Sequence, residues 1–217
     1  MADITKRAFL RHLQAGPTAH VRHIKRGRVV AEGTGLSFWY RPLTSALSEL
    51  PVDEQERPLV FRARTSDYQL VAVQATVTYR IADPASAATR IDFGIDPDTG
   101  VWRATPLEQL GGVLTELAQQ HAVAVLANLA LTEVMNSGIP RLREAIARGL
   151  GADGWLADIG VEVIGVRVIA VRPDGDIEKA LQNPIREQLQ QESDRATYER
   201  RARAVEQERA IGENELQ

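Results

Sequence analysis

The fold is decided by residues 68–81, which read YQLVAVQATVTYRI. Apolar and polar residues alternate here with a period of two, the repeat of a β-strand whose successive side chains point to opposite faces. One face carries Val71, Val73, Ala75, Val77, Tyr79 and Ile81, and the other carries Gln74, Thr76, Thr78 and Arg80. This pattern predicts an antiparallel strand with one face in the core and the other in water.

Shorter β patterns flank this strand on both sides. Residues 21–30 predict a hairpin about Arg26-Gly27, and residues 59–64 predict a further short strand. The run Phe38-Trp39-Tyr40 lies beside glycine and proline, so we expect a loop or a strand end there. Residues 161–171 are apolar almost throughout, which predicts a strand buried on both faces.

Helix signals occupy much of the remaining chain. Asp83-Pro84 predicts a short helix over residues 85–90, and a capping threonine before Pro106 predicts a longer one to as far as residue 131. A third, amphipathic helix is predicted over residues 140–150, before a cluster of glycines. Residues 4–14 also fit a short amphipathic helix, which at about three turns needs a protein or membrane surface to dock on.

The last 40 residues are helical and highly charged. Asn183-Pro184 predicts a cap and the first turn of a new helix, and the pattern reaches Gln217 without a final cap, as in a chain that continues. A helix with so little apolar surface needs neighbours, so we expect it to assemble with copies of itself. The weak heptad that would form the contact consists of Tyr198, Ala202, Val205, Arg209, Gly212 and Leu216.

Composition excludes several classes of protein. The 217 residues contain no cysteine, so disulfides, thiolate metal sites, cysteine nucleophiles and palmitoylation are ruled out. No uncharged apolar run approaches the roughly 18 residues of a membrane-spanning helix, and the basic start is not followed by the apolar stretch of a signal peptide. We therefore expect an intracellular chain that neither spans a membrane nor carries a lipid.

The overall net charge of −3 hides a basic N-terminal part. Residues 1–42 hold eight Lys and Arg residues against Asp3 and Glu32, a local net charge of +6. A basic face suits anionic headgroups or nucleic acid, and equally an ordinary solvated surface. No nucleic-acid-binding motif accompanies the charge, so specific nucleic-acid binding is not expected.

The sequence offers no catalytic or metal-binding constellation. The serines lack a nucleophile-elbow context, and no glycine loop is built to cradle phosphate. His20 and His23 are too few to hold a metal ion, and a strand would point them apart. We therefore expect no enzymatic activity, no cofactor and no metal.

Five short motifs, in order along residues 20–217, resemble the SPFH or Band 7 family of stomatins, prohibitins and flotillins. The first is Gly35-Leu36-Ser37-Phe38-Trp39 with Pro42. The second joins Thr65-Ser66-Asp67 to Val77-Thr78-Tyr79-Arg80-Ile81-Ala82-Asp83-Pro84. The others are Ala130-Leu131-Thr132-Glu133-Val134, Ile159-Gly160-Val161-Glu162-Val163 with Val166-Arg167-Val168, and the helix with Arg200-Arg201-Ala202 and residues 206–215.

The resemblance implies an α+β fold: an SPFH domain of two mixed α/β subdomains, with the antiparallel sheet first, followed by a long C-terminal helix. The expected parts are a basic amphipathic segment (1–19), two subdomains (20–95 and 96–173) and a charged helix (174–217). The family resemblance also implies an oligomeric, membrane-associated scaffold. The alternatives are a ring-forming regulatory subunit of a membrane protease and, less favoured, a nucleic-acid binder.

The chain lacks the hydrophobic N-terminal hairpin of stomatins and the acylation sites of flotillins. We therefore expect peripheral attachment to the cytoplasmic face of an anionic membrane. Aromatic rings beside arginine and glycine suit the headgroup depth of a bilayer. The residues expected to contact the membrane are Phe9, Leu10, Leu13, Phe38, Trp39, Tyr40 and Arg41.

Overall fold

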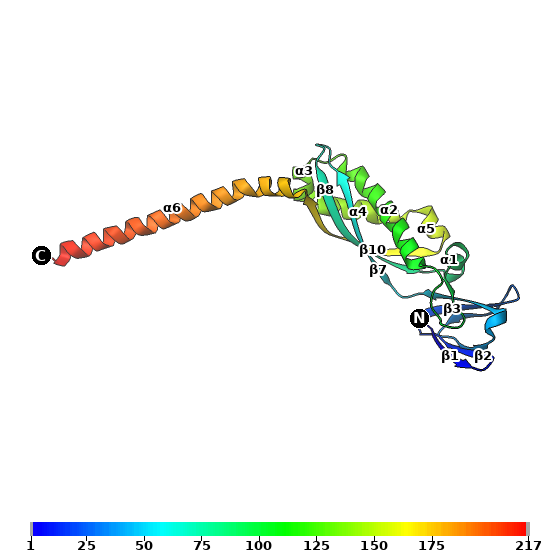
Figure 1. Cartoon of the computed structure of the whole chain (residues 1–217). Helices are drawn as coiled ribbons and strands as arrows, with labels where there is room; N and C mark the ends of the chain where they lie inside the picture. The colour runs from blue at the N-terminus through cyan, green and yellow to red at the C-terminus, as the bar shows by residue number, and fades with distance from the viewer. Residues whose placement is uncertain (1, 216–217) are drawn as a thin grey trace. The chain divides into compact units, whose positions relative to one another are not determined.

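The computed structural model describes residues 2–215, with the side chains of positions 178, 181–182, 184–185, 202 and 204–215 left out. Contacts divide the chain into two units, residues 1–172 and residues 173–217, which are described separately (Figure 1). The first unit is mixed, with antiparallel sheets and several helices. The second is a single helix.

The chain begins with a β-hairpin rather than the expected helix. Strands β1 (Asp3–Arg7) and β2 (Leu10–Gln14) pair with each other and with β5 (Ser37–Tyr40) to make a three-stranded sheet. The predicted helix over residues 4–14 is therefore wrong. Three apolar residues fit one side of a helix, but eleven residues form a marginal helix, and strand pairing satisfies the same backbone groups.

A second sheet lies against the first. Its order is β4 (Arg28–Thr34), β3 (Ala19–Lys25), β6 (Ser45–Pro51) and β9 (Gly94–Ile95). The predicted hairpin about Arg26-Gly27 is confirmed, and both turn residues have positive φ, as a tight two-residue turn requires. One core cluster joins the two sheets; its buried members are Ala2, Leu13, Val21, Tyr40, Leu47 and Ile95.

The third sheet has β8 (Leu70–Ile81) at its centre, between β7 (Gln55–Arg64) and β10 (Val161–Pro173). The predicted alternation is confirmed, because the six apolar residues predicted on the core face of β8 are all at most 2% exposed. β7 and β8 pair antiparallel, with Phe61 opposite Val73. β8 is paired with a strand on each side. A slip of one residue in this pairing would turn its buried face outward, so burial of that face fixes the register.

The expectation for residues 161–171 is wrong in one respect. They do form a strand, and Arg172-Pro173 ends it, but exposed side chains are interspersed with buried ones along it. Val161, Val166 and Val171 are buried, whereas Ile164 is 44% and Ile169 64% exposed. β10 is an edge strand of a three-stranded sheet, so an apolar run here does not imply cover on both faces.

Helices complete the first unit. The predicted α1 (Pro84–Arg90) is confirmed, and Asp83 caps it by accepting from the amides of Ala85 and Ser86. α2 (Pro106–Leu126) begins at the predicted proline but ends five residues early, and Thr105 makes no capping hydrogen bond through its side chain. A short α3 (Leu131–Glu133) and a π-helical turn, η2 (Val134–Gly138), lead into the expected α4 (Ile139–Gly151).

The glycine-rich stretch after α4 holds a short helix that the sequence did not predict, α5 (Gly154–Asp158), capped by Asp153. The turn that follows places Gly160 at a φ of 68° against the backbone of Asp83. Its carbonyl accepts from the amides of Ala82 and Asp83, at 2.8 and 3.0 Å. Gly160 therefore ties the start of β10 to the end of β8.

The second unit is one continuous helix, α6 (Gly175–Glu215). The prediction of a new helix at Asn183-Pro184 is wrong, since the helix has already begun after Asp174, whose carboxylate accepts from the Gly175 amide at 2.7 Å. Of the expected oligomerisation residues, Tyr198 is 74% exposed. The side chains of Ala202, Val205 and Arg209 are not described, and Leu216 lies outside the described residues.

Candidate functional site

Three loops meet at one end of the first unit. They are the β1–β2 turn (Ala8 and Phe9), the β3–β4 turn (Arg26 and Gly27) and the short 3₁₀ helix η1 (Pro42–Thr44), together called the three-loop end. Strand pairing brings them together, because Arg11 lies opposite Tyr40 and Lys25 lies opposite Ser45. Segments up to 36 positions apart in the chain thus form one surface.

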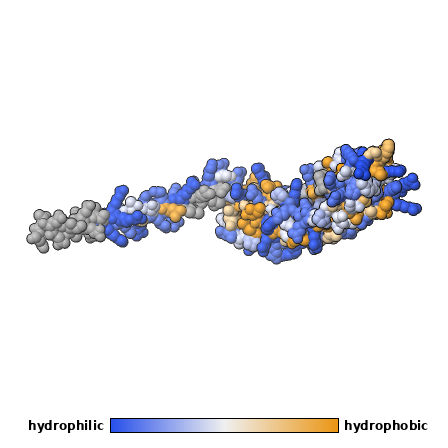
Figure 2. Space-filling model, turned by 90° about the horizontal axis from the view of Figure 1, so that it is seen from below, coloured by the Kyte–Doolittle hydropathy of each residue, from blue (hydrophilic) through white to orange (hydrophobic). Residues whose placement is uncertain are grey.

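Two large apolar side chains of this end are almost fully exposed. Phe9 is 88% and Leu43 is 99% exposed, whereas the core side chains of the same sheets, such as Leu13 and Val21, are fully buried. Exposed apolar side chains that gather on one surface mark a contact site more often than isolated ones do. In the space-filling view, hydrophobic and strongly hydrophilic surface lie next to each other over the strands of this end (Figure 2).

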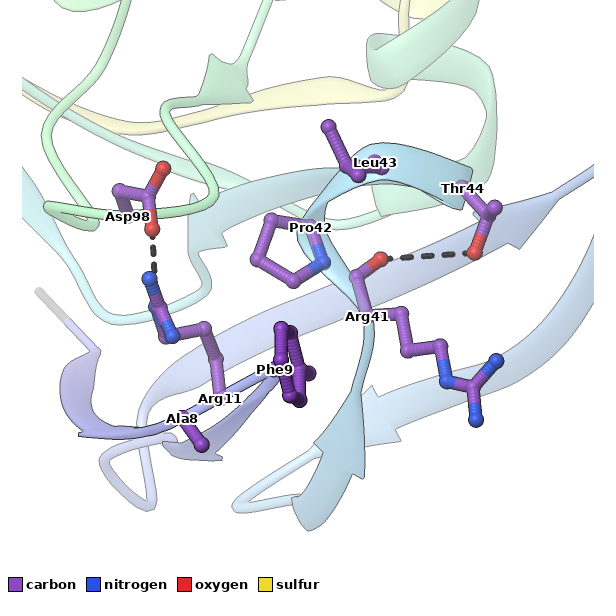
Figure 3. A pocket seen from close by; sticks show the side chains of 8 residues that line it. All are labelled: Ala8, Phe9, Arg11, Arg41, Pro42, Leu43, Thr44 and Asp98. Carbon is purple, nitrogen blue, oxygen red and sulfur yellow. Dashed lines mark hydrogen bonds and ion pairs between the residues drawn. The ribbon is translucent and has the colours of Figure 1, made fainter.

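A pocket of about 560 Å³ opens between the β1–β2 turn and η1. The Phe9 and Pro42 side chains lie on facing sides of it, and Arg11 reaches Asp98 at one edge (Figure 3). The Arg11 Nε atom and the Asp98 Oδ1 atom are 2.8 Å apart. The lining consists of Ala8, Phe9, Arg11, Arg41, Pro42, Leu43, Thr44 and Asp98.

Basic residues surround these apolar groups. Six are exposed and, within the described part of the chain, form no ion pair: Lys6, Arg7, Lys25, Arg26, Arg28 and Arg41. The two other N-terminal arginines are occupied, Arg11 by Asp98 and Arg22 by Glu32 at 3.7 Å. The three-loop end therefore combines free positive charge with exposed apolar side chains.

The outer face of the first sheet extends this surface. Trp39, on the edge strand β5, is 49% exposed and contacts one side chain from each of the other two strands of its sheet. The Arg7 guanidinium carbon is 5.8 Å from the Trp39 ring centroid, within cation–π range, and the His12 ring centroid is 4.7 Å from it. Leu10, 40% exposed, belongs to the strand between β1 and β5.

Three of the seven residues expected at a membrane face inward instead. Leu13 is fully buried and Tyr40 is 3% exposed, so neither can reach a bilayer. Phe38 is partly buried against the same core, where it stacks on His23 with ring centroids 4.9 Å apart. The reason is strand alternation, which sends Phe38 and Tyr40 to the core side and Trp39 to the outside.

Two titratable groups beneath the loops carry perturbed pKa values. Burial, with the nearby Asp98 carboxylate, raises the pKa of Tyr40 to about 12, so its hydroxyl stays protonated and donates to the Pro97 carbonyl at 2.6 Å. Burial, with a contribution from Lys25, lowers the pKa of His23. His23 is hydrogen-bonded to the Ser45 hydroxyl at 2.8 Å. These two hydrogen bonds hold Tyr40 and Ser45, which lie on either side of η1, in place.

The structure thus exposes Phe9, Leu10, Trp39 and Arg41 of the expected set and adds Leu43, which lies on η1 at the same end. The sequence analysis missed Leu43. A signal was present, because Leu43 is a lone apolar residue between Pro42 and Thr44, where the turn leaves little cover for it.

No single helix among the described residues is both long and apolar enough to cross a bilayer. The segments Pro106–Leu126 and Leu131–Gly151 reach that length and composition only as a pair, with a 115° bend between them.

Comparison with known proteins gives one clear match. The model of the SPFH domain / Band 7 family matches residues 19–210. Among curated proteins the chain has no match. Proteins of the matched family are generally membrane-associated scaffolds rather than enzymes. The match covers most of the sequence, including the second and third sheets and β5 of the first, and the chain therefore belongs to the SPFH domain / Band 7 family.

Proposed function

We propose that this chain is a scaffold that binds the cytoplasmic face of anionic membranes through its three-loop end and assembles through α6. One observation carries the membrane part: Phe9 and Leu43 project almost fully into solvent from a surface rich in unpaired Lys and Arg. These two side chains contribute little to the stability of the fold, because almost none of their surface is buried.

The energies support reversible binding. Each Lys or Arg near an anionic surface contributes about 1 kcal/mol, and six lie at or beside the three-loop end. Burying an apolar side chain of the size of Phe9 or Leu43 contributes roughly 1.5–3 kcal/mol. Either term alone gives weak binding, so we expect the charged and apolar parts to be needed together.

Assembly would multiply this binding. α6 has 41 residues and few apolar side chains, and exposed ones such as Leu189 and Tyr198 would gain cover from neighbouring copies. Once one subunit is bound, the others of the same assembly meet the membrane at a high effective concentration. Weak individual contacts then add up to stable attachment that can hold other membrane proteins in place.

Flotation with liposomes tests the membrane part. The intact chain should float with vesicles containing anionic lipid at low salt, and high salt should weaken binding by screening the basic residues. The double variant Phe9→Ser, Leu43→Ser should bind more weakly at every salt concentration. Ile164→Ser, Ile169→Ser is the matched control, because it removes two exposed apolar side chains from β10 of the third sheet. Failure of the intact chain to float would overturn the proposal.

Light scattering tests the assembly part separately. Deleting residues 185–217 should reduce the assemblies to small species, because most of α6 is removed while the first unit stays whole. A full-length chain that is monomeric at micromolar concentration would contradict assembly through α6.

A further inference from the structure

We propose that the pocket of the three-loop end is a binding site for one anionic phospholipid, with its phosphate held by arginine and its glycerol and upper acyl chain on the apolar wall. This inference rests on the proposed membrane binding and adds a specific ligand to it. A flat basic surface would attract any anionic membrane, whereas a pocket selects a single molecule.

The shape of the pocket fits part of a lipid molecule. Its volume of about 560 Å³ lies within the 300–1,000 Å³ typical of small-molecule sites. Its apolar lining consists of Phe9 on one side and Pro42 with Leu43 on the other (Figure 3), and Phe9 and Leu43 are almost fully exposed to solvent. An amphiphile could therefore enter with its apolar end still in contact with the bilayer.

The charges of the pocket select an anion. Its lining contains Arg11, Arg41 and Asp98, which leaves one net positive charge. The Arg11 guanidinium is held in place: Nε pairs with Asp98, and Nη1 donates to the carbonyls of Arg7 and Leu10 at 3.3 and 3.2 Å. Nη2 makes no hydrogen bond to any described residue, so one donor of a fixed guanidinium remains free for a phosphate oxygen.

Arg41 supplies the second cation from the other side. It is exposed, and its guanidinium lies away from Asp98 in the close view (Figure 3). The guanidinium also extends away from Arg11 (Figure 3), so a bidentate contact from Arg41 to a phosphate held by Arg11 requires this exposed side chain to turn toward the pocket. The flanking Lys25, Arg26 and Arg28 raise the positive potential at the entrance.

The apolar lining disfavours one other class of ligand, and the basic residues disfavour a second. A free phosphate would leave Phe9, Pro42 and Leu43 as exposed as before, so it gains only from the arginines. A zwitterionic headgroup would place its ammonium group among the basic residues, where like charges repel. A phospholipid whose headgroup carries only negative charge satisfies both halves of the pocket.

Titration calorimetry with soluble short-chain lipids tests the site without a membrane. Dihexanoyl phosphatidic acid should bind the intact chain at one saturable site per subunit. Dihexanoyl phosphatidylcholine and inorganic phosphate should each bind at least tenfold more weakly. Equal binding of phosphate would reduce the pocket to an anion site and overturn the lipid assignment, as would equal binding of the zwitterionic lipid.

Two variants locate the site. Ala8→Trp fills the pocket from an exposed turn without changing charge or removing Phe9 and Leu43, and it should weaken phosphatidic acid binding at least tenfold. Asp98→Asn should strengthen binding by removing the opposing charge. Unchanged binding in Ala8→Trp would show that the lipid binds elsewhere. Intact flotation without short-chain lipid binding would defeat this inference alone, whereas absent flotation would defeat the proposed function.

Discussion

Strand β8 and the three-loop end use apolar side chains in opposite ways. On β8, every core-facing residue from Val71 to Ile81 is at most 2% exposed, whereas Phe9 and Leu43 are 88% and 99% exposed. Burial of each valine or isoleucine side chain on the core face of β8 stabilises the fold by roughly 1.5–3 kcal/mol, and the exposed pair contributes almost nothing to it. Stability and membrane contact therefore depend on different parts of the first unit. A substitution in one part should leave the property of the other unchanged.

The largest effect is expected on β8. Val77→Asp should destabilise the chain by about 4 kcal/mol or more, because an unpaired carboxylate is placed in a fully buried position. Thr76→Asp changes the neighbouring residue on the opposite, partly exposed face and should be tolerated. Chemical denaturation of both variants makes the comparison. Equal destabilisation would mean that the two faces of β8 are not distinct.

The second-largest effect on stability is expected from a change that strains the backbone. Gly160→Ala should cost about 2 kcal/mol or more, because a φ of 68° is unfavourable for alanine and the added Cβ would lie 2.6 Å from the Asp83 carbonyl oxygen. Gly154→Ala is the matched control, with open space at the new Cβ and helical backbone. If both variants unfold at the same denaturant concentration, the Gly160 contact does not hold β8 to β10.

A smaller effect concerns the base of the three-loop end. Burial lowers the pKa of His23 in the folded chain below its ordinary value of 6.5, so the unfolded chain takes up the proton more readily. The stabilising contribution is present above pH 6.5 and is lost as the pH falls through that value toward the folded-state pKa. His23→Phe keeps a ring against Phe38 and should abolish this part of the decline between pH 7.5 and 5.5. Identical pH profiles of stability for the native chain and His23→Phe would contradict this role of His23.

The smallest effect on stability should come from the exposed pair. Phe9→Ser, Leu43→Ser should change the free energy of unfolding by no more than about 0.5 kcal/mol, since neither side chain is buried. Thermal unfolding of this variant beside the native chain measures it. A loss of 2 kcal/mol would mean that the pair supports the fold, and the separation of stability from contact would fail.

The sequence predicts the sheet around β8 well because a long strand with one wet face leaves a strict alternation. It predicts the N-terminal sheet poorly. Residues 9, 10 and 13 fit a helical stripe as well as a strand, and only pairing with Ser37–Tyr40, distant in sequence, decides between them. The inward direction of Leu13 and Tyr40 follows from the same pairing. Four of the seven residues expected at the membrane are exposed in the structure. Which of the seven face outward depends on the strand register, which the sequence pattern does not determine.

The central claim is that Leu43 enters a membrane while the rest of the fold stays outside. Because the native chain has no cysteine, Leu43→Cys provides a single attachment point for a polarity-sensitive fluorophore, and Thr132→Cys on α3 provides a control point. The account predicts that anionic vesicles shift the emission of the label at position 43 to shorter wavelength and leave that at position 132 unchanged. No shift at position 43, or equal shifts at both positions, would contradict it.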